Sequence, residues 1–161
     1  MFDHSRLFAV SVFLFTAASS AAWAQSASPP PANSGVVRAP SVYSVDETID
    51  RLKDDIAVKG ITYFTTIDQS DPAAGVDIEL RPSKLLIFGN PPLGVQFLTA
   101  SPYAGLDWPV RMLVFEDGSG QVWVAYTDFA FIGERYALED RDAQLNMATG
   151  VAASIAASVA P

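Results

Sequence analysis

The chain has 161 residues, one histidine, no cysteine and a formal net charge of −8. Its length predicts one domain, because domains span roughly 100 to 200 residues. The negative charge argues against nucleic acid and anionic membranes as partners, since both attract cationic surfaces. Without cysteine, the chain has no disulfide, no thiol nucleophile and no cysteine for lipid attachment.

The first 24 residues have the pattern of a secretory signal peptide. Arg6 precedes an uncharged, mostly apolar stretch over residues 7–22, and Ala22-Trp23-Ala24 gives the small residues of a cleavage site. The alternative is an uncleaved anchor, but the apolar stretch is shorter than the roughly 20 residues that span a bilayer. We therefore expect cleavage after Ala24, and a periplasmic or secreted protein with no membrane contact.

Residues 25–35 are rich in Ser, Ala and Pro and are expected to form a disordered leader before a single domain over residues 36–161. A first strand is predicted over residues 36–42. Ser44 and Glu47 have the spacing of a capping box, which predicts the start of a helix. The apolar stripe of this helix consists of Val45, Ile49, Leu52 and Ile56. Gly60 is expected to end the helix.

A second strand is predicted over residues 61–67, where β-branched and aromatic residues dominate, and Asp71-Pro72 is expected to start a turn or a single helical turn. The apolar run over residues 84–88 favours a central strand that is covered on both faces. This strand ends in the corner Gly89-Asn90-Pro91-Pro92-Leu93-Gly94, and a short helix is expected over residues 95–100.

The C-terminal part begins with a loop over residues 101–109 and two strands over residues 110–115 and 121–127, joined by a hairpin turn. Asp128 is expected to cap a short helix, and a long helix over residues 140–160 carries mostly small side chains on one face. That face predicts packing on the sheet or on a second copy. The order β-α-β-β-β-β-α indicates an α+β domain with a mainly antiparallel sheet and helices on one face.

Three sequence stretches together resemble the bacterial domain-of-unknown-function family 302. They are Leu80-x-Pro82-x-Lys84-x-Leu86-x-Phe88-Gly89-Asn90-Pro91, Gly105-Leu106-Asp107-Trp108-Pro109 and Val122-Trp123-Val124-x-Tyr126. The resemblance implies a TATA-binding-protein-like arrangement and a homodimer, with no settled activity, substrate or cofactor. Members often have an Asp-His pair where this chain has Asp68-Gln69, so any role of that histidine is absent or altered here.

Without its leader, which contains His4, the chain cannot build a Ser-His-Asp triad or a usual zinc site. No metal site and no cofactor are predicted. Carboxylates are the remaining acid-base candidates, and those considered are Asp68, Asp77, Glu79, Asp107 and Asp128. Asp77 and Glu79 share one face of an extended stretch and could hold a hard cation, although solvated surface charge is the simpler interpretation. The other three are expected mainly to cap turns or helices.

The corner at Asn90 is the stronger functional candidate, because a helix beginning there could present free N–H groups to an anion. The alternative is a strand-to-helix corner without a ligand. Lys84 and Arg111 could add cationic side chains to such a site, and the alternative for these two is an ordinary exposed sheet face. Tyr103 and Trp108 are large aromatic side chains in a loop, where such rings often cover a cavity or meet a partner. The predicted ligand-binding residues are Asn90, Tyr103, Asp107 and Trp108.

The leading functional hypothesis is a periplasmic binding or accessory domain for a small molecule, present as a homodimer. One alternative is a hydrolase or isomerase that works through carboxylates, with or without Mg²⁺ or Ca²⁺. A second is a structural protein that acts by dimer or partner contact through its C-terminal helix.

Overall fold

The computed structural model describes residues 29–76 and 78–161. The expected signal peptide, residues 25–28 and Asp77 lie outside these residues. The strands of the described part are β1 (Val36–Ser41), β2 (Thr62–Asp68), β3 (Ser83–Gly89), β4 (Val110–Glu116) and β5 (Val122–Thr127). Its helices are α1 (Val45–Val58), α2 (Ser70–Ala74), α3 (Pro91–Ala100), the 3-10 helix η1 (Pro102–Leu106), α4 (Phe129–Arg135) and α5 (Asp142–Ala157).

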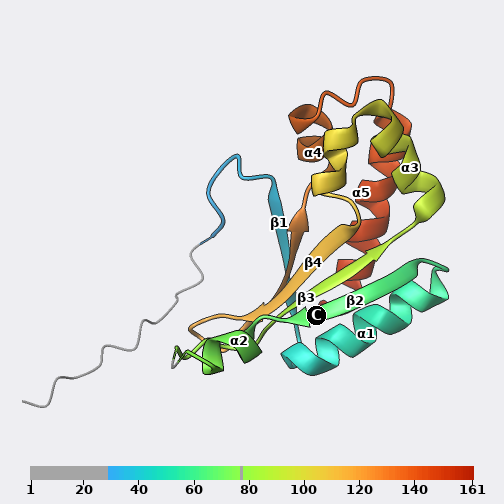
Figure 1. The fold of residues 1–161 in the computed structure, drawn as a ribbon. Helices are drawn as coiled ribbons and strands as arrows, with labels where there is room; N and C mark the ends of the chain where they lie inside the picture. Colours follow the sequence, from blue (N-terminus) through green and yellow to red (C-terminus); the bar gives the residue numbers. More distant parts are fainter. Residues whose placement is uncertain (1–28, 77) are drawn as a thin grey trace, which may run out of the picture.

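The strands form one antiparallel sheet in the order β1-β5-β4-β3-β2, as the α+β prediction required (Figure 1). The pairing register aligns Leu85 with Leu113, Leu113 with Ala125, and Ala125 with Arg38. Side chains in such a row point to the same face of the sheet, because strand side chains alternate between faces. This register therefore decides which residues face the helices.

Helices α1 and α5 cover one face of the sheet, and α3 and α4 gather at one end of it (Figure 1). The predicted α1 stripe is buried against β2, β3 and β4, and α5 contacts β5, α4 and α1. The side chains most deeply buried between these layers are Leu52, Ile56, Leu86, Met112, Val114, Val124, Ile155 and Val159. The small-residue face of α5 thus packs within the chain, which is one of the two arrangements that the sequence predicted.

Local hydrogen bonds place the helix ends where the capping signals predicted them. Ser44 Oγ accepts from Glu47 N at 3.3 Å, and Asp128 Oδ1 accepts from Ala130 N at 3.0 Å. Both bonds satisfy N–H groups that the first turn of a helix leaves without a carbonyl partner. Before the first strand, Gly35 O accepts from Asp128 N at 2.7 Å, so contacts with the domain begin before Val36.

The second face of the sheet carries apolar side chains that remain partly exposed. We call this surface the open sheet face, and its central residues are Leu85, Ile87, Leu113, Phe115 and Trp123. The prediction that the strand at residues 84–88 is covered on both faces was therefore wrong. The apolar run alone could not show that one face is open, because a strand covered on both faces and a strand covered on one face can have the same composition. Within the described residues, no helix has the length and apolar character to cross a membrane.

The β4–β5 hairpin is closed by one carboxylate. Asp117 Oδ1 accepts from Ser119 N at 2.8 Å and from Gln121 N at 3.1 Å, while Oδ2 accepts from Trp123 Nε1 at 2.8 Å. The hairpin turn and the indole on the open sheet face therefore depend on the same side chain.

We expect this carboxylate to make folding acid-sensitive. The hydrogen bonds donated by Ser119 and Trp123 hold the pKa of Asp117 below its ordinary value. Such a group stabilises the fold above the pKa of the unfolded chain and loses that contribution as the pH falls below it. Between about pH 5 and pH 3, Asp117→Asn should therefore lose less free energy of unfolding than the wild type. Urea titrations at each pH measure the free energy of unfolding. An equal decrease from pH 5 to pH 3 in the variant and the wild type would contradict the prediction.

Two glycines provide a matched test of backbone conformation. A Cβ would meet no atom within 4 Å at either Gly60 or Gly150, but Gly60 has a φ of +65° whereas Gly150 lies inside α5. Gly60→Ala should destabilise the protein by about 1 to 2 kcal/mol, because L-residues are disfavoured at positive φ. Gly150→Ala should stabilise it by about 0.5 to 1 kcal/mol, because glycine is a poor helix former. Chemical denaturation measures the free energy of unfolding of both variants. Changes of the same sign would contradict the backbone conformations assigned to the two glycines.

Candidate functional site

A cavity of about 470 Å³ lies at the end of the sheet that α3 approaches, between the end of β3 and α5. Most of its wall is apolar. The apolar lining consists of Ile61, Phe88, Gly89, Leu93, Trp108, Val110, Phe129, Met147, Ala148, Gly150, Val151 and Ala152. The polar residues on the wall are Lys59, Asn90, Asn146 and Ser154. This composition suits a small, largely apolar molecule.

Trp108 forms one side of the cavity and depends on two glycines. A Cβ at Gly94 would overlap the indole, and a Cβ at Gly89 would lie 2.9 Å from Trp108 Cζ2. The indole also meets Phe97 edge-to-face, with 6.2 Å between ring centroids. The glycines of the predicted corner are therefore required by the close approach of Trp108.

Asn90 is the N-cap of α3, and its position overturns the predicted anion site. Its Oδ1 accepts from Leu93 N at 3.3 Å, and its backbone oxygen accepts from Leu93 N and Gly94 N at 3.1 and 2.9 Å. Pro91 and Pro92 occupy the first two helical positions and have no N–H. The start of this helix therefore has no free N–H group to offer an anion.

Helix α5 supplies the wall that the sequence analysis did not identify. Met147, Gly150 and Val151 line the cavity, and Gly150 leaves open space where another residue would place a side chain. A glycine in the interior of a helix was the available signal, because it weakens the helix unless packing or a cavity requires it.

Asp107 and Tyr103, two of the predicted ligand residues, do not line the cavity. The Asp107 side chain is only 6% exposed and forms ion pairs with Arg111 and Arg135. It also accepts from Tyr136 Oη at 2.6 Å, and this bond raises the pKa of the Tyr136 hydroxyl. Tyr103 is 71% exposed on η1. The structure therefore brings together Asn90 and Trp108, while Asp107 joins β4 to α4.

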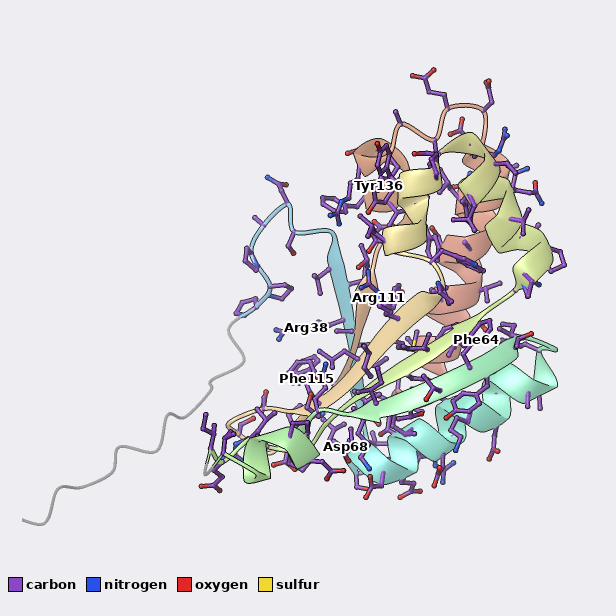
Figure 2. The ribbon with its side chains drawn as sticks, viewed as in Figure 1. Arg38, Phe64, Asp68, Arg111, Phe115 and Tyr136 are labelled. Carbon is purple, nitrogen blue, oxygen red and sulfur yellow. The ribbon has the colours of Figure 1, made fainter. Side chains whose placement is uncertain are left out.

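Lys84 and Arg111, the two cationic side chains predicted near Asn90, form ion pairs away from the cavity. Lys84 Nζ lies 2.7 Å from Asp46 Oδ1 and 3.1 Å from Asp68 Oδ2, and these bonds raise the lysine pKa. Arg111 is held by Asp107. Asp68 and Tyr136 lie at opposite ends of the molecule, so these two ion-pair clusters are well separated (Figure 2). A cationic cavity wall made by Lys84 and Arg111 is therefore contradicted.

The remaining carboxylates have local roles. Asp68 Oδ1 accepts from Ser70 N at 2.9 Å, which lowers its pKa, and Asp128 caps α4. Glu79 is exposed in a segment without strand pairing, and Asp77 lies outside the described residues. Across residues 29–76 and 78–161, no group of three or more His, Cys, Asp or Glu side chains is placed to hold a metal ion.

Comparison with known proteins gives two kinds of relative. Over 106 residues, the chain is 39% identical to proteins named "Fluoride-specific ion channel FluC 1" from Brucella suis and Brucella abortus. These matches cover 66% of this chain but 42% and 39% of the two relatives. The chain thus spans about two fifths of the curated relatives that it matches.

A solved structure confirms the fold. The "uncharacterized conserved protein DUF302 from Bacillus stearothermophilus" superposes with a TM-score of 0.68 at 15% identity, over 78% of this chain and 98% of that one. The profile of the family described as "Domain of unknown function DUF302" matches residues 37–157. The matched residues include all residues of the cavity wall. They also include all five strands of the described chain except Val36, the first residue of β1. The chain therefore belongs to the DUF302 family.

Proposed function

We propose that this domain binds a small apolar molecule in the cavity between β3, α3 and α5. The observation that carries the proposal is the cavity itself, with a volume of about 470 Å³ and a mostly apolar wall. Ligand sites in proteins typically measure about 300 to 1,000 Å³ and combine apolar walls with a few polar groups. Here the few polar groups include Asn90 at one side and Asn146 and Ser154 on α5.

Binding is better supported than carboxylate catalysis. The carboxylates of Asp68, Asp107 and Asp128 each accept structural hydrogen bonds or ion pairs from neighbouring residues. None of the three lines the cavity. A pair of carboxylates that divides acid and base roles must face one reacting group, and the cavity wall offers no such pair among the described residues.

Filling the cavity should abolish binding. Nile red, an uncharged and apolar fluorescent dye, should bind the wild-type protein with an enhanced, blue-shifted emission. Gly150→Phe should weaken its affinity at least tenfold, because the added ring projects into the space beside Gly150. A fluorescence titration of each protein gives the dissociation constants.

The matched control is Ala153→Phe, which adds the same ring at an exposed position of the same helix that does not line the cavity. It should leave the affinity for Nile red unchanged. Circular dichroism verifies that both variants fold. Absence of Nile red binding to the wild type, or equal binding by Gly150→Phe, would refute the cavity as a binding site.

The setting that we propose is an accessory domain of the periplasm or the medium. The signal-peptide pattern over residues 1–24 supports export. The relatives named as fluoride-specific ion channels support an accessory role beside a membrane protein, because this domain matches only about two fifths of their length. The net charge of −8 and the lack of free N–H groups at α3 argue against fluoride as the ligand of this domain.

The open sheet face supports a second proposal, a homodimer in which two copies stack these faces. Its apolar side chains would be buried by a second sheet, and stacked sheets are a common packing arrangement. Strands lie about 4.8 Å apart and rise about 3.4 Å per residue, so five strands of about six residues present roughly 500 Å². Two such faces bury on the order of 1,000 Å², which reaches the lower range of specific interfaces.

A charge at the centre of this face should separate the copies. Leu113 is flanked by Leu85 and Ala125 in the sheet register, so Leu113→Glu should convert a dimer to a monomer by placing carboxylates inside the interface. The control Val58→Glu lies on α1, where the native side chain is 86% exposed, and should remain dimeric. Sedimentation equilibrium measures the masses. A monomeric wild type at tens of micromolar would refute this proposal without affecting the cavity.

A further inference from the structure

We propose that the cavity selects an uncharged apolar molecule that carries one hydrogen-bond acceptor, such as a carbonyl oxygen. This inference rests on the proposed binding function and names the class of its ligand. Three features of the cavity wall carry it: the apolar surface, the ion-paired lysine and the amide donor of Asn90.

The apolar wall disfavours a charged ligand. Phe88, Phe129, Ala148 and Ala152 on this wall are buried, and Trp108 packs against the same core. A charge transferred from water into such surroundings loses hydration, and this loss must be offset by an opposite charge or by several hydrogen bonds. The choice between ligand classes therefore depends on which charges the wall provides.

Lys59 is the charged residue on the wall, and its charge is already balanced. Its Nζ lies within 2.6 Å of both carboxylate oxygens of Asp55, and the side chains are only 29% and 20% exposed. A ligand carboxylate near Lys59 would meet Asp55 as well, so attraction and repulsion would largely cancel. A ligand ammonium near Lys59 would likewise meet both charges of this pair, and no Asp or Glu lines the cavity itself within the described residues. Both signs of charge are thus disfavoured.

The polar group next to β3, the Asn90 side chain, offers a donor rather than an acceptor. The Oδ1 atom of Asn90 is occupied by Leu93 N, which leaves the Nδ2 amide hydrogens as the polar part of this side chain that can serve a ligand. This donor on the cavity wall matches one acceptor oxygen on an otherwise apolar molecule.

Displacement of Nile red by four eight-carbon molecules tests this inference. The probes are 2-octanone, octanoate, octylammonium and n-octane, which share a similar chain and differ in the polar group. At pH 7.4, we expect 2-octanone to displace the dye at a concentration at least tenfold below those of octanoate and octylammonium. It should also outcompete n-octane by about fivefold or more, because a carbonyl gains a hydrogen bond inside the cavity.

Asn90→Asp is the matched variant, because aspartate caps a helix as well as asparagine but has no amide hydrogens. This variant should lose most of the preference for 2-octanone over n-octane. Tighter binding of octanoate or octylammonium than of 2-octanone would overturn the inference and leave the binding function standing. An unchanged ketone preference in Asn90→Asp would overturn the assigned role of Asn90. Failure of Nile red itself to bind would overturn the binding function, and the two failures are therefore distinguishable.

Discussion

The contact between Trp108 and the two glycines of the β3–α3 corner is the constraint on which the candidate site depends. Gly94 has no room for a Cβ beside the indole, and Gly89 has little. The indole can therefore lie close to both the end of the sheet and the first turn of α3, and it meets Phe97 on that helix. Because these three parts are held together on one side, the space up to α5 remains open as a cavity.

Local signals predicted the fold well because they act over a few residues. Ser44 and Asp128 cap helices in the structure as their spacing indicated, and the α1 stripe is buried on the sheet. The antiparallel hairpin of β4 and β5 followed from its turn residues in the same way. What these signals could not show was the environment of each face. The strand at residues 84–88 has an apolar side chain on both faces, but only one face has a helix against it.

The candidate site was predicted in part. Asn90 and Trp108 were identified because they stand beside a tight corner, and the structure places both on the cavity wall. The anion interpretation was wrong, since Pro91 and Pro92 remove the N–H groups that it required. Asp107 was also misassigned, because its partners Arg135 and Tyr136 are 28 and 29 residues away in sequence. The α5 wall was missed for the same reason: nothing near Asn90 in the sequence indicates which helix will face it.

The strand order has a consequence for how the chain reaches its folded state. Strand β2 pairs with β3, β3 with β4 and β4 with β5, so most of the sheet can assemble from neighbouring segments as they are synthesised. The first strand, β1, pairs with β5, the last strand in the sequence, with Val36 opposite Thr127. It must remain unpaired while roughly ninety residues emerge, and closing so long a loop is slow. The complete five-stranded sheet can therefore form only after β5 has been synthesised, even though β2, β3 and β4 can pair earlier.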